Sequence, residues 1–175
     1  MRWTRRQFAD RWERAFVRPG WFGQRGRTCQ QATWTLSLAG EYAQATGQAA
    51  ASALIDLEKA YEHINYQYLW SMAEKHGFNL RLLRFIIRLY QGPRHVMVNG
   101  IITCAVHALT ASVIAGCAHA TALMKLTLVD SLDYVATRWP SAISTVVVDD
   151  TQFHMVGRSA LVRYTILGAT ADFKD

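Results

Sequence analysis

The stretch AISTVVVDDTQFHMV, residues 142–156, decides the fold, because two runs of β-favouring residues in it flank the pair Asp149-Asp150. Valine, isoleucine, threonine and phenylalanine are enriched in strands, whereas aspartate is common at turns. The stretch therefore predicts a β-hairpin whose tip carries both aspartates. Ionised carboxylates side by side in a sheet repel each other, so we expect a cation to bind among them.

A second β-run, AASALIDL at residues 50–57, brings Asp56 to the end of a short apolar segment. Such a segment, followed by a charged turn, predicts a buried strand. Hard cations such as magnesium prefer oxygen ligands and are often held by one or two carboxylates together with substrate phosphates. Two such ions could activate a 3′ hydroxyl and stabilise a leaving pyrophosphate in phosphoryl transfer. The alternative is that these aspartates only hydrogen-bond the backbone of their own turns.

The remaining pattern is mainly helical. Apolar spacing and end signals predict helices at about 4–16, 28–46, 65–76, 80–91 and 118–137. The segment RHVMVNGIITCAV, residues 94–106, contains Asn99-Gly100, the strongest short-range signal for a hairpin with a type I′ turn. This order of elements predicts an α+β domain with an antiparallel sheet that helices cover on one side.

Composition places the chain among globular proteins, with 51% hydrophobic and 18% charged residues. Cys29, Cys104 and Cys117 lack the spacing of a zinc site or a disulfide framework, so we expect free thiols in a reducing intracellular compartment. Residues 101–124 lack charged side chains and are long enough to span a membrane, but Gly116 and several polar residues interrupt them. A strand, loop and helix fit this stretch better, and we expect no membrane partner.

The formal charge of +6 is concentrated at the N-terminus, where the first 27 residues hold eight arginines against Asp10 and Glu13. Aromatic residues alternate with these arginines, a pattern that can follow a phosphate backbone and stack on bases. The alternative is an amphipathic helix with a solvated arginine face. On the first interpretation, the residues that would bind nucleic acid are Arg5, Arg6, Arg25 and Arg27.

Two segments resemble motifs of the reverse transcriptase family, especially enzymes of non-long-terminal-repeat retrotransposons and group II introns. ALIDLEKAYEHI, residues 53–64, resembles the first palm motif, in which a metal-binding Asp precedes Lys-Ala and an aromatic residue. TVVVDDTQFHMVG, residues 145–157, resembles the Asp-Asp motif. GQRGRTCQQA, residues 23–32, is similar to a stretch rich in glycine and arginine that precedes the first palm motif.

The resemblance implies an RNA-directed DNA polymerase, a nucleotidyltransferase whose palm domain binds magnesium, or manganese, through Asp56, Asp149 and Asp150. Leu57 would offer a backbone carbonyl to the nucleotide, and Tyr61 would lie under its sugar and exclude a 2′ hydroxyl. The partners would be an RNA template, a DNA primer and deoxynucleoside triphosphates. The location that the resemblance implies is nuclear or cytoplasmic.

A fourth segment, ASVIAGCAHATALMKL at residues 111–126, falls where the family has a Gln-Gly turn followed by Ser-Pro. Gly116 is retained and would let the substrate base approach the backbone closely. Ala115 replaces the glutamine, and Ala120-Thr121 replace Ser-Pro.

By the same resemblance, residues 1–48 would be a basic helical segment from the fingers and residues 49–175 a palm-like domain. The strands that clamp the triphosphate and the thumb would lie outside this truncated chain. Because positioning and electrostatics supply most phosphoryl-transfer catalysis, we expect the isolated chain to polymerise poorly. The alternative function is that of a catalytically inactive retroelement relic that acts as a basic nucleic-acid-binding module.

Overall fold

The computed structural model describes residues 2–24 and 26–174, and its packing divides the chain into two units. Unit 1 comprises Met1–Ala15 and Lys59–Thr127, and unit 2 comprises Phe16–Glu58 and Leu128–Asp175. Neither unit is a continuous stretch of chain. The boundary expected at residue 48, between a fingers segment and a palm-like domain, is a functional division that these packing units do not test. It stays a prediction.

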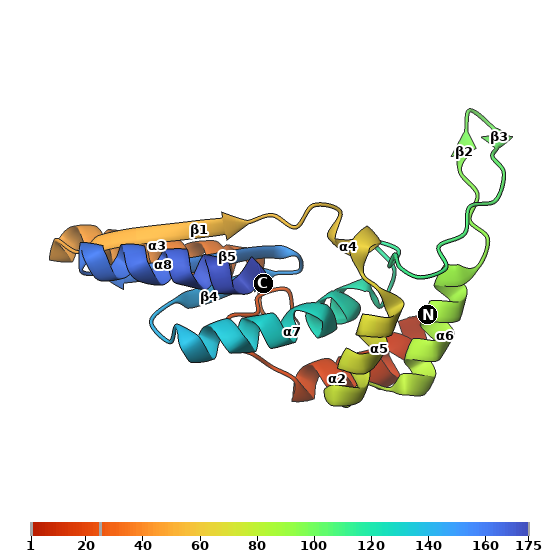
Figure 1. Ribbon diagram of the computed structural model, residues 1–175, viewed down its shortest axis with the longest axis horizontal. Coiled ribbons are helices and arrows are strands. Elements are labelled where there is room, and N and C mark those ends of the chain that lie inside the picture. Colours follow the sequence, from red (N-terminus) through yellow and green to blue (C-terminus); the bar gives the residue numbers. More distant parts are fainter. Residues whose placement is uncertain (1, 25, 175) are drawn as a thin grey trace. The chain divides into compact units, whose positions relative to one another are not determined.

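Unit 2 contains an antiparallel sheet of β1 (Ala49–Ile55), β5 (Asp150–Gly157) and β4 (Ile143–Val147), in that spatial order (Figure 1). The strand predicted at residues 50–57 forms as β1, but it is an edge strand in which Ile55 alone is buried, so the expectation of a buried strand was wrong. The predicted hairpin is confirmed, with one difference. Val147 pairs with Asp150, so the turn is Val148-Asp149 and Asp150 is the first residue of β5. This register places every second residue of β5, including Phe153, on one face of the sheet, and a slip of one residue would turn them to the opposite face.

Helices cover both faces of this sheet, which corrects the expectation of a single covered face. Adjacent residues of a strand point to opposite faces, yet Phe153 and His154 are both buried, at 0% and 4% exposure. On the Phe153 face lies α8 (Ser159–Lys174), whose Phe173 ring is 5.5 Å from that of Phe153. The opposite face is covered by α3 (Cys29–Thr46), seen behind the sheet in Figure 1.

The start and end of α3 follow from local sequence signals. Thr28 and Gln31 form a capping box, in which the Thr28 hydroxyl accepts a bond from the Gln31 amide at 3.2 Å and the Gln31 side chain accepts one from the Thr28 amide at 2.9 Å. Gly47 ends the helix in the left-handed region, with φ of 65°. The predicted helix at 28–46 is confirmed.

A short segment before α3 extends the sheet next to β4. Trp21 forms a parallel bridge with Val146, the Phe22 amide donates to the Val146 carbonyl at 2.8 Å, and the Val146 amide donates to the Gly20 carbonyl at 2.8 Å. A Cβ on Gly20 would collide with the backbone carbonyl of Ser144. Glycine is therefore required for this close approach.

Unit 1 is mainly helical. Its N-terminal helical run consists of α1 (Arg2–Thr4), a π-helical turn (Arg5–Ala9) and α2 (Asp10–Ala15), and it is followed after residue 58 by α4 (Ala60–His63), α5 (Tyr66–Lys75) and α6 (Leu80–Gln91). The helix α7 (Ala120–Arg138) begins in unit 1 and continues into unit 2. The helices predicted from apolar spacing are thus confirmed.

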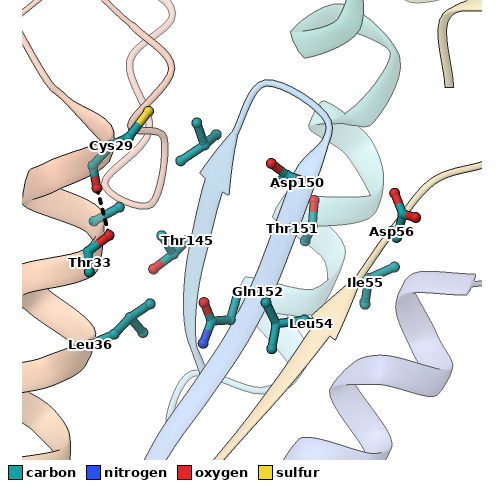
Figure 2. A pocket seen from close by; sticks show the side chains of 12 residues that line it. Cys29, Thr33, Leu36, Leu54, Ile55, Asp56, Thr145, Asp150, Thr151 and Gln152 are labelled. Carbon is teal, nitrogen blue, oxygen red and sulfur yellow. Dashed lines mark hydrogen bonds between the residues drawn. The ribbon is translucent and has the colours of Figure 1, made fainter.

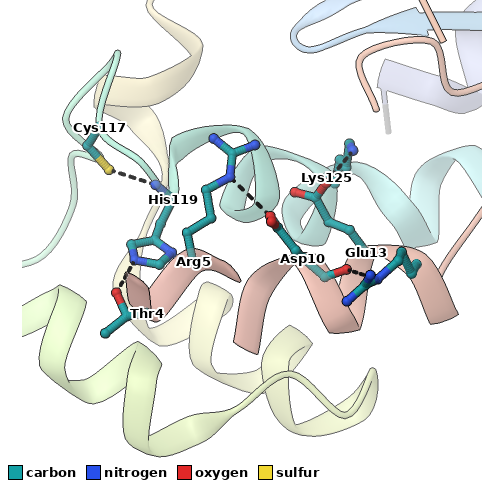
Figure 3. Close-up of polar contacts among 8 residues, drawn as sticks. Thr4, Arg5, Asp10, Glu13, Cys117, His119 and Lys125 are labelled. Atoms are coloured by element: carbon teal, nitrogen blue, oxygen red, sulfur yellow. Dashed lines mark hydrogen bonds and ion pairs between the residues drawn. The ribbon is translucent and has the colours of Figure 1, made fainter. Parts of the chain in front are cut away.

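The N-terminal helical run is attached to the rest of unit 1 by both apolar and polar contacts. The Trp12 ring packs edge to face on Phe78 at 5.3 Å, and its indole nitrogen donates to the His76 carbonyl at 2.9 Å. Figure 3 shows the polar contacts, in which Glu13 pairs with Lys125 at 3.3 Å. These contacts fix the run to the α5–α6 turn and to α7.

The second predicted hairpin is confirmed, with β2 (Met97–Val98) paired to β3 (Ile101–Ile102). Asn99 and Gly100 have φ of 50° and 79°, as a type I′ turn requires. The charge-free stretch 101–124 forms β3, a loop and the start of α7 rather than one helix. Among the residues described, no helix has the length and apolar character needed to cross a membrane.

Candidate active site at the ends of β1 and β5

Asp56 and Asp150 lie side by side at the ends of neighbouring strands (Figure 2). Asp56 directly follows Ile55, and Ile55 pairs with Thr151, the residue after Asp150. Opposed residues of an antiparallel pair point to the same face, with Cβ atoms about 4.5–5.5 Å apart. Continued by one residue, this register puts Asp56 opposite Asp150, so both carboxylates project to the sheet face that α3 covers.

The two carboxylates border a cavity of about 370 Å³ between the sheet and α3. Pockets of this size accommodate small ligands. Its polar lining includes Thr33 of α3 together with Thr145 and Gln152 of the sheet. The rest of the lining is largely apolar, which leaves the carboxylates as the charged groups of the cavity.

Asp149 occupies the second position of the turn between β4 and β5 and does not line the cavity. It follows Val148, which has a φ of 64°. Positive φ is rare for a β-branched residue and costs of order 1–3 kcal/mol. A Cβ on Gly23 would lie 2.8 Å from the Val148 amide nitrogen, so the segment before α3 packs directly against this turn.

The structure thus brings Asp56 and Asp150 together and leaves Asp149 on the adjacent turn. Within residues 2–24 and 26–174, no three His, Cys, Asp or Glu side chains converge closely enough to form a metal site as they stand. No described lysine or arginine forms an ion pair with any of the three aspartates. Because the two adjacent carboxylates are exposed and uncompensated, their oxygen donors fit a hard divalent cation.

A polar pair, exposed Ser52 and buried His154, lies further along the same sheet face. The Ser52 hydroxyl is 2.7 Å from His154 Nδ1, while His154 Nε2 has no hydrogen-bond partner among the described residues. Burial lowers the pKa of His154. This pair was not predicted from the sequence. Its signal is the alternation of polar residues along β5, which puts His154 on the same face as Gln152 and Asp150.

The residues expected to bind the nucleotide are divided between the units. Leu57 follows Asp56 in unit 2 and is half-buried, whereas Tyr61 and Gly116 belong to unit 1. The Val113 amide donates to the Tyr61 carbonyl at 2.8 Å. Gly116 has a φ of 79°, and a Cβ there would meet nothing within 4 Å. The backbone at Gly116 is therefore open to an approaching ligand.

The arginines expected to bind nucleic acid differ in their exposure and in the contacts that they already make within the chain. Arg5 pairs with Asp10 at 3.2 Å, and Arg6 is exposed. Arg27 donates to the Pro19 carbonyl and lies over the Phe22 ring. The fourth, Arg25, lies outside the described residues.

Two comparisons with known proteins found no match. No protein-family model matches the chain, and no curated protein matches its sequence. The function of the site is therefore argued from its own residues and from their resemblance to polymerase motifs.

Proposed function

We propose that this chain is the palm part of an RNA-directed DNA polymerase and that Asp56, Asp149 and Asp150 hold its magnesium ions. One observation supports this most strongly. Asp56 and Asp150 are 94 residues apart in the sequence. Asp56 follows the last residue of β1 and Asp150 is the first residue of β5, so the two lie at the same edge of the sheet, on one face, and border the same cavity. These are the two segments that resemble the metal-binding motifs of reverse transcriptases.

The charges of the site also favour bound cations. Two exposed carboxylates without a basic partner repel each other, and a divalent ion between them would relieve this repulsion. Magnesium, or manganese in its place, would activate the primer hydroxyl and stabilise the leaving pyrophosphate. The protein would contribute Asp56 and Asp150 as ligands from rigid strand ends, with Asp149 as a further ligand from the turn. The cavity beside them would take part of the nucleotide.

Metal binding can be tested without any catalytic assay. Manganese titration followed by electron paramagnetic resonance would compare the natural chain with Asp56→Asn/Asp150→Asn. The matched control is Glu41→Gln/Glu74→Gln, which removes two exposed carboxylates elsewhere. We expect manganese affinity to fall at least tenfold in the aspartate variant and to stay unchanged in the control. Equal affinity in all three proteins would overturn the proposed metal site.

Catalysis is tested by primer extension on an RNA template with magnesium. The proteins compared are the chain alone, the chain joined to the fingers and thumb of a related polymerase, and the Asp149→Ala variant of each. We expect weak extension by the chain alone, stronger extension by the longer protein and none by the variants. Extension that survives in Asp149→Ala would contradict the assigned role of this carboxylate.

A second candidate function is that of a catalytically inactive retroelement protein that binds nucleic acid. It is favoured by Ala115, an exposed residue at the position where the related enzymes have a glutamine. A methyl group there cannot make the polar contact of an amide. Absence of extension even in the longer protein, together with metal-independent and salt-sensitive RNA binding, would support this function instead.

A further inference from the structure

The excess positive charge of the chain belongs to unit 1. Its two segments hold 12 lysines and arginines and four acidic residues, which gives a formal charge of +8. Unit 2 holds seven lysines and arginines and nine acidic residues, which gives a formal charge of −2. Along the sequence, the excess positive charge lies in the first 27 residues. The structure packs residues 1–15 with residues 59–127, which carry seven basic and two acidic side chains of their own.

A row of three exposed arginines on α6 is part of this charge. Arg81, Arg84 and Arg88 are spaced three and four residues apart. At about 100° per residue they fall within an arc of about 60° on the helix. The buried side chains of α6 centre on the opposite side of the helix, and they are Leu82, Leu83, Ile86 and Tyr90. The row therefore points away from the core of unit 1.

The arginines of this row have no acidic partner. The helix contains no Asp or Glu, and none of the three arginines forms an ion pair among the described residues. Like charges three and four residues apart on a helix repel each other. Arg81 also lies in the first turn, where the helix dipole disfavours a cation. An external polyanion would compensate all of these charges.

The spacing of the row suits a phosphate backbone. At about 1.5 Å per residue, Arg81 and Arg88 are about 10.5 Å apart along the helix axis, close to the rise of three base pairs at about 3.4 Å each. The planar guanidinium group binds phosphate oxygens in a bidentate manner. Exposed Phe85 flanks the row and could contact a sugar or a base.

An anionic membrane fits this helix less well. A helix that lies in a membrane interface inserts a broad apolar face among the lipids. The apolar face of α6 is already buried in unit 1, and its exposed large apolar residues are Phe85 and Leu89. What remains outside is mainly charge, which favours a soluble polyanion.

We propose that Arg81, Arg84 and Arg88 bind the sugar-phosphate backbone of a nucleic-acid duplex without sequence preference. This proposal rests on the proposed function in that it names a surface for the template–primer duplex. The binding itself needs neither the metal nor the aspartates. The two proposals can therefore fail independently.

The test measures the affinity for a fluorescein-labelled RNA–DNA duplex by anisotropy, in EDTA and at several salt concentrations. The variant is Arg84→Gln/Arg88→Gln, and the matched control is Arg158→Gln/Arg163→Gln, which removes two exposed arginines from unit 2 and leaves the same net charge. We expect the first to bind at least tenfold more weakly at 0.1 M salt. Its slope of log affinity against log salt should be smaller by about 1.8, at about 0.9 for each lost phosphate contact. The control should behave as the natural chain.

Equal losses in the two double variants would overturn the proposal, because the effect would then reflect net charge alone. An unchanged salt slope in Arg84→Gln/Arg88→Gln would also overturn it. Arg84→Lys/Arg88→Lys keeps both charges on the same helix and should keep most of the slope, which separates charge loss from damage to the fold.

Two further measurements complete the test. Binding to vesicles of phosphatidylserine tests the other anionic partner, a membrane. If Arg84→Gln/Arg88→Gln lost vesicle binding but kept duplex binding, the assignment of the row to nucleic acid would be overturned. The metal-site variant Asp56→Asn/Asp150→Asn should bind the duplex as the natural chain does. Loss of duplex binding in that variant would show that the aspartates are needed for binding, and would contradict the α6 surface as proposed.

Discussion

Two helix glycines differ in what an added methyl group would meet. A Cβ on Gly168 of α8 would collide with the Trp139 ring, whose nitrogen donates to Asp172 at 2.6 Å and which packs edge to face on Tyr164. A Cβ on Gly40 of α3 would meet nothing within 4 Å. We expect Gly168→Ala to lower the free energy of unfolding by about 1–3 kcal/mol. Gly40→Ala should raise it by about 0.5–1 kcal/mol.

Urea denaturation of both variants measures this difference. Shifts of the same sign in the two proteins would contradict the packing of Trp139 against α8.

The buried histidine of β5 makes stability depend on pH. Burial lowers the pKa of His154 below the ordinary histidine value of about 6.5, so below pH 6.5 the unfolded chain binds a proton that the folded protein does not. Stability should therefore fall as the pH decreases below 6.5, by at most about 1.4 kcal/mol per pH unit for each such histidine. His119 should contribute in the same direction, because burial also lowers its pKa.

His154→Gln should reduce this pH dependence, whereas His63→Gln, at an exposed position, should leave it unchanged. The measurement is the free energy of unfolding in urea at pH 7.5, 6.5 and 5.5. Identical slopes in the natural chain and in His154→Gln would show that His154 is not kept neutral by the fold.

At the scale of single elements, the capping box of α3 is a measurable contribution to stability. Thr28→Ala removes the hydroxyl that accepts the Gln31 amide, so we expect the free energy of unfolding to fall by about 0.5–2 kcal/mol. Thr35→Ala is the matched control, because the Thr35 hydroxyl bonds only to the Gln31 carbonyl of its own helix. The control should change stability little. A Thr28→Ala variant as stable as the control would mean that the cap contributes nothing in solution.

Elements with strong local signals could be predicted from the sequence. The capping box and Gly47 delimit α3, and Asn99-Gly100 determines the β2–β3 turn. One feature of the sheet could not be predicted, because it depends on a partner distant in sequence. Trp21 pairs with Val146 through backbone bonds that no side-chain pattern encodes.

The same limit applies to the candidate site. The motifs singled out Asp56 and the Asp149-Asp150 pair, but their relative placement needed the strand register. In that register Asp150 belongs to β5, while Asp149 remains on the turn. The Ser52–His154 pair likewise becomes visible only when β1 and β5 are aligned.

At the scale of the whole molecule, the N-terminal helical run is tied to a distant part of the chain. Glu13 and Lys125 are 112 residues apart in sequence, and their side chains are 10% and 4% exposed (Figure 3). Thr4 also contacts His119 at 3.1 Å. The face of the run that contains Trp12 and Glu13 therefore binds its own chain. Arg6 of the same run remains exposed.

The Glu13–Lys125 pair gives a prediction about how this arrangement holds together. Burial lowers the pKa of Lys125, and Glu13 opposes this effect by stabilising the charged amine. Removing one charge leaves the other buried, so Glu13→Leu or Lys125→Met alone should lower the free energy of unfolding by about 3 kcal/mol or more. The double variant should lose much less than the sum, because it removes both desolvation costs. Glu41→Leu, at an exposed position of α3, serves as the control.

Urea denaturation of the four proteins of this cycle measures the coupling energy, and trypsin cleavage at Arg11 and Arg14 reports on the N-terminal run itself. We expect each single variant to be cleaved there faster than the natural chain, because the run detaches more often when one charge is left unpaired. The double variant should resist cleavage better than either single one. Strictly additive losses, with equal cleavage in all proteins, would show that the pair does not hold residues 2–15 against α7.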